Sequence, residues 1–325
     1  MEEKPLDNIL IFEPQYKSVI WGGNRISELK GEYPGEEHIG ESWEISPLSG
    51  HESIVAEGPH KGMSISELSD MYGRELLGNN VVRKYGNKFP LLIKLLDAHD
   101  ILSLQVHPND EVAQKYHASQ GKSEMWYVID AGKDAQIYCG LSKRLTPETF
   151  DIHVNDKTIM NMVASYHSKP GQFYYLPAGT IHTIGAGNLI AEIQQASDIT
   201  YRVYDHNRTN SDGHPRDLHI DLARAALDYS FPNETTPTAH QFENSTCGVV
   251  INEHFTVDYY KVDTSSIDIY PDKGSFTAML VTKGVVNITA DGEMRSVKAG
   301  HTVLIPASVG HIELSGNGIV LATHV

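Results

Sequence analysis

The length of 325 residues exceeds what one compact hydrophobic core usually accommodates, so we expect two domains. The formal net charge of −16 argues against nucleic acids and anionic membranes as partners, because their phosphates would be repelled over most of the surface. No apolar run approaches the roughly 20 residues that span a bilayer, and the start of the sequence lacks a secretory pattern, so a cytoplasmic location is expected. The only cysteines, Cys139 and Cys247, provide neither a disulfide framework nor a thiolate zinc site.

The expected helices are few and lie between strands. Residues 64–67 fit a capping box at the start of a helix that continues through Leu68 and Met71. Thr146 followed by Pro147 is typical of a helix start, because proline fits the first helical position. A third helix is expected within residues 217–229, before a segment (231–240) that is rich in proline and turn-forming residues.

A strand with one polar face is expected over residues 101–107. Ser103, Gln105 and His107 alternate with leucines and a valine, and successive side chains of a strand point to opposite faces. These three polar side chains therefore share a face. Pro108 then ends the strand.

Two further segments offer metal ligands. Glu124 opens the apolar segment 125–129, where a bare buried carboxylate would be costly, and His182 follows a Pro-Ala-Gly turn. A divalent metal bound by His107, Glu124 and His182 would satisfy all three groups. The same ligand set suits zinc and the facial triad of non-haem Fe(II) oxygenases, so it leaves the metal open. Gln105 either completes the ligand set or hydrogen-bonds a ligand.

Three cations are expected near these ligands in a chain that is otherwise acidic. Lys94 interrupts the apolar run 90–96, so it should face a cavity or an anion. Lys122 precedes Glu124 by two residues, which directs both side chains to the same face. Arg202 alternates with aromatic and β-branched residues, as a strand position would. Each cation could pair with a structural carboxylate, but three together favour an anionic ligand.

Two carboxylates follow the His182 strand in the sequence. Glu192 lies on the adjacent strand-like segment, so it is expected either near the metal or in an ion pair with Arg202. Asp198 begins the segment of Arg202 and could equally cap a turn.

An internal repeat indicates the fold. Residues 171–182 are echoed by residues 300–311, with glycine, proline, alanine and histidine at the same offsets. Strand-length segments between turns recur in both halves, which predicts a mainly β protein of two jelly-roll or β-sandwich domains with a few helical inserts. We place the catalytic domain at 1–238 and a C-terminal domain at 239–325. The second repeat has His311, but its segment 276–284 lacks a carboxylate, so we expect this domain to be metal-free.

Four segments resemble the type I mannose-6-phosphate isomerases, which are zinc enzymes of the cupin superfamily. They are residues 102–108 (LSLQVHP), 121–125 (GKSEM), 177–182 (PAGTIH) and 192–202 (EIQQASDITYR). The resemblance runs from Trp21-Gly22 through Glu41-Ser-Trp43 to about Leu227. The chain length resembles that of the short bacterial form.

The resemblance implies a role for each candidate residue. One zinc ion would be bound by Gln105, His107, Glu124 and His182. Arg202 would be catalytic, Lys122 and Glu192 would line the reacting end of the sugar, and Ser103 and Lys94 would bind substrate. The chain departs from the long form at Gly121, where a histidine commonly stands, and at Ile184, where a tyrosine is found.

The implied reaction is the reversible conversion of mannose 6-phosphate into fructose 6-phosphate through a cis-enediol, with Glu192 as the hypothetical base. The expected partner is thus a small phosphosugar. Two alternatives share part of the pattern. An Fe(II)-dependent cupin oxygenase would use the same triad without needing the three cations, and a non-catalytic sugar-phosphate-binding cupin would keep the cations and could lose the metal. The sequence leaves the oligomeric state open.

Overall fold

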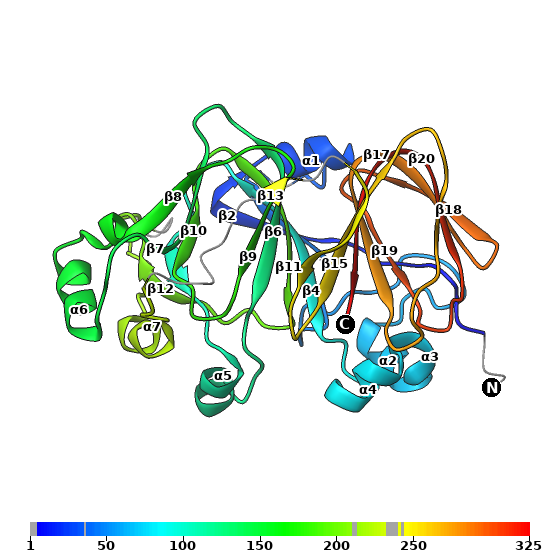
Figure 1. The fold of residues 1–325 in the computed structure, drawn as a ribbon, viewed down its shortest axis with the longest axis horizontal. Helices are drawn as coiled ribbons and strands as arrows, with labels where there is room; N and C mark the ends of the chain where they lie inside the picture. Colours follow the sequence, from blue (N-terminus) through cyan, green and yellow to red (C-terminus); the bar gives the residue numbers. More distant parts are fainter. Residues whose placement is uncertain (1–4, 36, 210–212, 232–239, 242–243) are drawn as a thin grey trace.

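The strands of this chain form three antiparallel sheets. A computed structural model describes residues 5–35, 37–209, 213–231, 240–241 and 244–325. Two sheets face each other in an N-terminal unit, and the third forms a C-terminal unit beside it (Figure 1). The expected fold class, mainly β with two jelly-roll or sandwich units and a few helices, is confirmed.

The two sheets of the N-terminal unit enclose an apolar cluster. The larger sheet contains, in spatial order, β13 (His240–Gln241), β9 (Gln172–Leu176), β6 (Glu124–Ala131), β11 (Asn188–Gln195), β4 (Leu91–Ala98), β3 (Ile39–Ile45) and β2 (Gln15–Gly23). The smaller sheet contains β12 (Tyr201–Tyr204), β5 (Leu104–Val106), β10 (His182–Ile184), β7 (Gln136–Leu141) and β8 (Val163–His167). Trp126 and Ile190 from the larger sheet meet Ile137 from the smaller one.

The C-terminal unit consists of one eight-stranded sheet. Its strands in spatial order are β1 (Leu10–Ile11), β19 (Thr302–Ile305), β17 (Thr277–Ala290), β20 (Ile312–His324), β15 (Thr256–Val262) and β14 (Thr246–Ile251), with β16 (Ile267–Ile269) on β20 and β18 (Glu293–Lys298) on β17. Met279, Ile288 and Leu314 belong to the apolar cluster of this unit.

A shared core joins the two units. Ile93, Met125 and Ile193 on β4, β6 and β11 belong to the same buried cluster as Tyr259 and Leu280 of the C-terminal unit. The central strands of the larger sheet are therefore buried on both faces, which explains their nearly continuous apolar sequences. Side chains that alternate with this cluster point into the interior of the N-terminal unit, where the candidate site lies.

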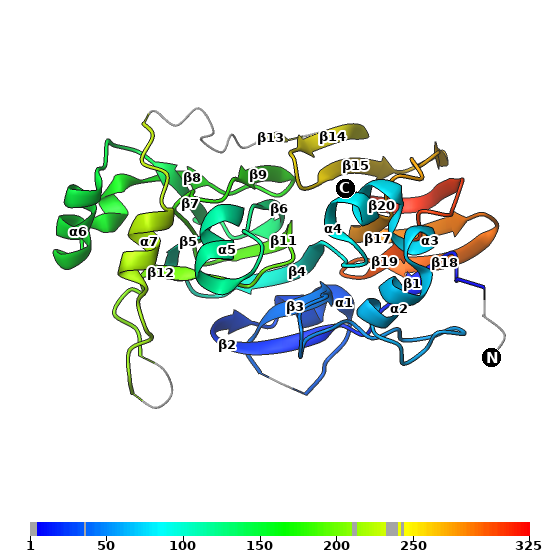
Figure 2. The same cartoon turned by 90° about the horizontal axis from the view of Figure 1, so that it is seen from below.

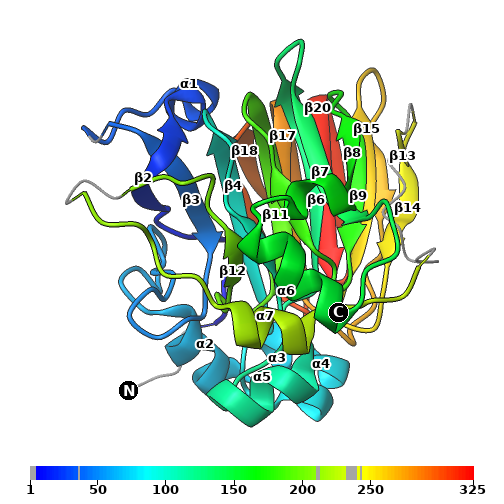
Figure 3. The ribbon, with the colours of Figure 1, turned by 90° about the vertical axis from the view of Figure 1, so that its left-hand side faces the viewer.

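The helices surround the sheets. They are α1 (Arg25–Lys30), α2 (Ile65–Tyr72), α3 (Arg74–Leu77), α4 (Asn79–Tyr85), α5 (Asp110–His117), α6 (Pro147–Asn155) and α7 (Ile220–Ala226), with the 3-10 turn η1 (Ile159–Met162). Phe150 of α6 and Ala223 of α7 pack against the outer face of the smaller sheet (Figure 2). Helices α2 to α5 gather at one end of the strands, opposite α1 (Figure 3). Within the described residues, none of these helices has the length and apolar character needed to cross a bilayer.

Two of the expected helix starts are present as predicted. Ser64 and Glu67 form a reciprocal capping box before α2, and Thr146 caps α6 with Pro147 in its first turn. The third expected helix is shorter than 217–229 and covers only Ile220–Ala226. The preceding residues are not helical because they bond to β12, where the backbone N–H of His219 donates to the carbonyl of Arg202.

Strand pairing crosses the expected domain boundary in both directions. β1, near the start of the chain, pairs with β19 of the C-terminal sheet, whereas β13 pairs with β9 of the N-terminal unit. Residue 238 itself lies outside the described residues. The division into 1–238 and 239–325 stays a prediction.

The two copies of the internal repeat have similar local structure. In each copy a strand, β9 or β19, leads through a Pro-Ala turn to a histidine at or just before the next strand. His182 is buried, whereas His311 is partly exposed and its Nε2 lies 2.7 Å from Asp268 Oδ1. The repeat thus marks equivalent places in two different environments.

Candidate metal centre and active-site cavity

The smaller sheet places three predicted site residues in one row. Arg202 on β12 lies opposite Gln105 on β5, and Gln105 lies opposite His182 on β10. Cross-strand partners share a face of the sheet. The leucine and valine on either side of Gln105 belong to the outer apolar cluster instead, so the row points inward.

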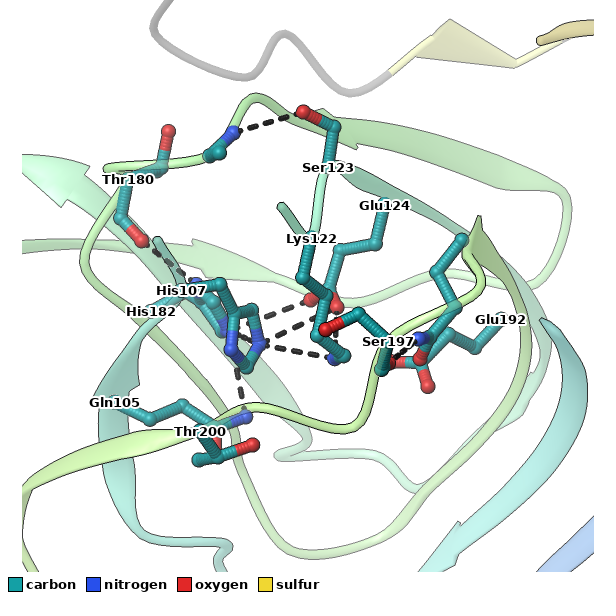
Figure 4. A network of polar contacts seen from close by, with 12 residues as sticks. Gln105, His107, Lys122, Ser123, Glu124, Thr180, His182, Glu192, Ser197 and Thr200 are labelled. Carbon is teal, nitrogen blue, oxygen red and sulfur yellow. Dashed lines mark hydrogen bonds and ion pairs between the residues drawn. The ribbon is translucent and has the colours of Figure 1, made fainter. Parts of the chain in front are cut away.

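The three candidate metal ligands His107, Glu124 and His182, which we call the metal cluster, meet at one end of this row (Figure 4). The Nε2 atoms of the two histidines are 3.2 Å apart, and each lies 3.3 Å from an oxygen of Glu124. All three side chains are at most 1% exposed. A tetrahedral ion with bonds of about 2.0–2.1 Å separates its ligand atoms by about 3.4 Å, so this triangle fits three ligand positions.

The hydrogen bonds of both histidines leave the nitrogen that faces this triangle unprotonated. Nδ1 of His107 donates to the carbonyl of Ile199 at 2.9 Å, and Nδ1 of His182 donates to that of Thr180 at 2.8 Å. Each Nε2 therefore offers a lone pair. Burial, aided by the charge of Lys122, lowers the pKa of His107 to about 4, and burial also lowers the pKa of His182. Both rings are thus neutral at physiological pH, as metal binding requires.

Glu124 supplies the negative charge of the cluster. Burial opposes its ionisation, but the ammonium group of Lys122 outweighs burial and holds the pKa of Glu124 well below the usual range. Lys122 Nζ lies 2.6 Å from Oε2 of Glu124 and 3.0 Å from Nε2 of His107. The buried Oε1 accepts no hydrogen bond from the described residues, which is costly for a carboxylate. Two neutral imidazoles and one carboxylate with an unsatisfied oxygen fit a divalent metal ion.

Gln105 lies beside this cluster. Its amide nitrogen is 3.3 Å from Nε2 of His182. Because amide oxygen and nitrogen exchange places on a half-turn of the group, the oxygen reaches the same point. The position of Gln105 is thus compatible with both alternatives from the sequence, a fourth ligand and a hydrogen-bonding partner of a ligand. The ligand role stays a prediction.

Hydrogen bonds to α5, to the turn before it and to β11 fix the backbone around Lys122. The N–H of Gly121 donates to the carboxylate of Asp110 at 2.6 Å, and that of Lys122 donates to the carbonyl of Pro108 at 3.0 Å. The next N–H donates to the side chain of Gln195 at 2.8 Å, and Gln195 in turn donates to Asp110 at 3.0 Å. These bonds direct the Lys122 side chain toward the metal cluster.

The positions that depart from the long form provide no polar side chain. A Cβ on Gly121 would lie 2.5 Å from the backbone nitrogen of Asp110 and 2.6 Å from the carbonyl carbon of Asn109. No side chain fits there while α5 begins at its present place. Ile184 is buried in the apolar cluster between the two sheets.

The larger sheet places Glu192 between two donors. Lys94 on β4 and Trp126 on β6 are its cross-strand neighbours. Trp126 Nε1 donates to Oε1 of Glu192 at 2.9 Å, and Lys94 Nζ lies 3.3 Å from Oε2. Burial lowers the pKa of Lys94, but Glu192 and Glu41 outweigh it and raise that pKa overall. Glu192 therefore pairs with Lys94, and not with Arg202 as the alternative reading of the sequence had it.

Arg202 faces the same space without an ion pair to a carboxylate among the described contacts. Its Nη1 donates to the backbone carbonyl of Asp217 at 2.8 Å, and its buried Nε has no hydrogen-bond partner in the described part of the chain. Burial and the positive charge of Arg216 lower its pKa, although an arginine stays protonated. Arg202 is thus available to an anionic group.

These groups line a cavity of about 380 Å³, within the size range of small-molecule sites. Six predicted residues are in its wall: Lys94, Ser103, Gln105, Lys122, Glu192 and Arg202. The remaining wall residues are Val19, Trp21, Glu41, Leu96, Leu102, Asp198, Thr200 and Arg216. The metal cluster adjoins this wall through its contacts with Lys122 and Gln105.

Two charged wall residues were missed from the sequence. Glu41 lies in the Glu-Ser-Trp segment of the resemblance, so that motif was a usable signal. Arg216 lies between β12 and α7, outside any strand or helix, so no period predicts the direction of its side chain. Its role could be recognised only from the folded chain.

Comparisons with known proteins agree with this geometry. A model of the phosphomannose isomerase type I catalytic domain matches residues 9–131, and one of the mannose-6-phosphate isomerase cupin domain matches residues 245–325. The chain is 33% identical to the mannose-6-phosphate isomerase ManA of Bacillus subtilis and 34% identical to that of Streptococcus mutans, in each case over 97% of this chain and 98% of the relative. A crystal structure of the mannose 6-phosphate isomerase from Bacillus subtilis superposes with a TM-score of 0.85 at 30% identity, covering 98% of this chain and 100% of the other.

The fold and the site define a cupin-type enzyme in which a buried cluster that could hold a metal ion lies beside a polar cavity. The full-length matches identify its family: the chain belongs to the type I phosphomannose isomerases, which are aldose–ketose isomerases. The resemblance seen in the sequence is confirmed.

Replacing Glu124 with Gln should abolish stable metal binding. The substitution keeps the shape of the side chain but removes its charge, so we expect a loss of more than about 100-fold in affinity. Metal content after dialysis, measured by plasma mass spectrometry, tests this. His311→Gln, at the equivalent place in the second repeat, is the matched control and should retain the wild-type metal content. Full metal occupancy in Glu124→Gln would show that the cluster is not the metal site.

Replacing Gly121 with Ala should destabilise the protein. The added Cβ meets backbone atoms at 2.5–2.6 Å, so the start of α5 must move, at a cost of about 1–3 kcal/mol. Urea unfolding measures this loss. Gly132→Ala is the control, because its Cβ would have its nearest neighbour at 3.7 Å, and its stability should change by less than about 0.5 kcal/mol. Equal stabilities of the two variants would contradict the close approach at Gly121.

Proposed function

We propose that this chain interconverts mannose 6-phosphate and fructose 6-phosphate with one zinc ion, through a cis-enediol intermediate. The observation that carries this proposal is the shared location of the two-histidine, one-carboxylate cluster and of Glu192 at one cavity lined by cations. The substrate is taken from the names of relatives that are 33–34% identical over 97% of this chain.

The reaction moves a proton between two adjacent carbons and another between their oxygens. A base must remove the proton from C2 of the open-chain aldose, and negative charge that develops on oxygen must be stabilised. Bound to His107, Glu124 and His182, a zinc ion would act as a Lewis acid toward the substrate oxygens without changing its oxidation state. Gln105 would be the fourth protein ligand.

Glu192 is the base in this scheme. Its carboxylate takes the C2 proton as the aldehyde oxygen gains a proton, which gives the cis-enediol. The same carboxyl group then returns its proton to C1 as the hydroxyl on C2 loses one, which gives the ketose. Trp126 and Lys94 each contact one oxygen of Glu192, so both donors fix the direction of the carboxylate.

The cations and one hydroxyl would act on the substrate oxygens. Lys122 lies against the metal cluster, where its ammonium group stabilises charge at the reacting carbons or relays the hydroxyl proton. Arg202 stabilises the same developing charge from the row of Gln105. Ser103, buried in the cavity wall, and Lys94 would bind the sugar hydroxyls.

A coupled assay that converts fructose 6-phosphate onward tests the reaction. Purified protein should turn over mannose 6-phosphate, lose at least about 90% of this activity on chelation and regain it when zinc is restored. Oxygen uptake measured in parallel tests the Fe(II) oxygenase alternative. Failure to isomerise with zinc bound, or oxygen consumption with iron, would refute the proposed function.

Glu192→Gln should abolish exchange of solvent tritium into the substrate. The amide cannot accept the C2 proton, so exchange and turnover should both fall by at least about 1,000-fold. Glu41→Gln removes the other carboxylate beside Lys94 and serves as the comparison, because it should retain exchange even where affinity changes. Near wild-type exchange in Glu192→Gln would assign the base to another group.

A further inference from the structure

Asp205, just after β12, binds two arginines that the proposed chemistry does not use. Its side chain is 5% exposed. Arg216 donates through Nε to Oδ2 at 2.7 Å and through Nη2 to Oδ1, which is a two-pronged pairing, and Arg208 donates through Nη2 to Oδ1 at 2.7 Å. Burial raises the pKa of Asp205, but the two guanidinium groups outweigh it and lower that pKa overall.

Positive charge exceeds negative charge around this carboxylate. The third guanidinium group nearby is that of Arg202. Burial lowers the pKa of Arg202, and Arg216 lies close enough for its positive charge to lower that pKa further. Arg208 also donates to the carbonyl of Ile101 and lies 3.7 Å from the exposed Asp100. Arg208 and Arg216 thus share one buried carboxylate, and Arg202 beside them has no carboxylate partner among the described contacts, so the group has unused capacity for an anion.

Only part of this group reaches the cavity. Arg202 and Arg216 are in the cavity wall, whereas Asp205 and Arg208 are not. Asp205 therefore contacts Arg216 on the side away from the cavity. It fixes the guanidinium group of Arg216, because a side chain held at two nitrogens loses most of its rotational freedom. The side facing the cavity has two guanidinium groups and the unpaired Nε of Arg202.

The position of these arginines relative to the metal cluster suggests which end of a substrate they meet. His182, Gln105 and Arg202 lie on adjacent strands, so the backbone of Arg202 is about 10 Å from that of His182 at the usual strand spacing of about 4.8 Å. The reacting carbons must lie beside the metal cluster and Glu192. The side chain of Arg202 reaches inward from this strand, and a charged substituent at the other end of a six-carbon chain then lies toward Arg216, which is beside Arg202 in the cavity wall.

We propose that Arg216 binds the phosphate group of the substrate and that Asp205 is the positioning residue that holds Arg216 in place. This inference rests on the proposed function, because it assumes that a sugar phosphate reacts at the metal cluster. It adds two residues to the site and gives them separate roles. Arg216 sets the preference for a phosphorylated sugar, and Asp205 sets the geometry of that contact without touching substrate.

The test uses zinc-loaded full-length protein and two readouts. Steady-state kinetics with mannose 6-phosphate give kcat and KM, and titration calorimetry with inorganic phosphate gives the affinity of the anion site without any reaction. Arg216→Met should raise KM and weaken phosphate binding, each by about 10- to 100-fold, with kcat changed by less than about threefold. Arg216→Lys keeps the charge but loses the fork, so its KM should be intermediate.

Asp205→Asn tests the positioning role. It keeps the size of the side chain, so the fold should survive, while the weaker pairing with Arg216 should raise KM by about 3- to 10-fold and leave kcat nearly unchanged. A merely structural role would lower the unfolding temperature and kcat without a selective change in KM. Arg224→Met is the matched control, because Arg224 also pairs with aspartates but lies on α7 outside the cavity wall, and it should keep wild-type KM and phosphate affinity.

The two readouts separate failure of this inference from failure of the proposed function. Unchanged phosphate affinity in Arg216→Met, or a fall in kcat with unchanged KM, would overturn the role of Arg216. A wild-type KM in Asp205→Asn would overturn the positioning role. A wild-type protein that binds phosphate through Arg216 but does not isomerise mannose 6-phosphate would refute the reaction while retaining the anion site.

Discussion

The charge of Glu124 is the constraint on which the site depends. This carboxylate is fully buried at the start of β6, where its ionised form is stable only with positive charge beside it. Lys122 provides part of that charge, and the histidine nitrogens aimed at the same carboxylate form the other two corners of a triangle that could hold a metal ion. The neighbouring hydrogen bonds serve this requirement. Those of His107 and His182 determine which ring nitrogen is protonated, and that of Gly121 helps to direct the Lys122 side chain.

Charge pairing extends from this centre through the cavity in alternating order. Lys94 lies between Glu41 and Glu192, and Arg216 lies between Asp205 and the cavity. In each case a cation contacts a carboxylate that lies at most 3.7 Å from it. The directions of these side chains are therefore fixed before a substrate enters, which lowers the reorganisation that the reaction requires.

Much of the site could be predicted because strands have a simple period. Gln105 and Arg202 each alternate with apolar residues of the outer cluster, so their inward direction could be read from the sequence. Among the candidate ligands, Glu124 was suggested by the cost of a bare carboxylate in an apolar segment, His107 by its place on a polar strand face, and His182 by the Pro-Ala-Gly turn before it. Capping boxes at Ser64 and Thr146 were local enough to be recognised. The family resemblance added the roles and the substrate.

What could not be predicted depends on contacts between distant segments. The helix expected over 217–229 is shortened because residues before Ile220 bond to β12, and helical propensity contains no information about such a partner. The pairing of Glu192 with Lys94 instead of Arg202 depends on strand order, since β4 is next to β11 and β12 lies in the other sheet. Arg216 lies outside any strand or helix, so no period indicated the direction of its side chain.

The central strands of the larger sheet are buried on both faces, and this connects the cavity on one face with the C-terminal unit on the other. Each inward-facing group on β4, β6 and β11 has a chain neighbour that packs against Tyr259, Leu280 or other residues of the second unit. The C-terminal unit thus packs against the sheet that carries the cavity wall, although none of its described residues is in that wall. An N-terminal unit produced alone would expose the large apolar face that now packs against the second unit. It would also lose the packing that aligns its carboxylates. Both effects give a physical reason for the two units to be made as one polypeptide.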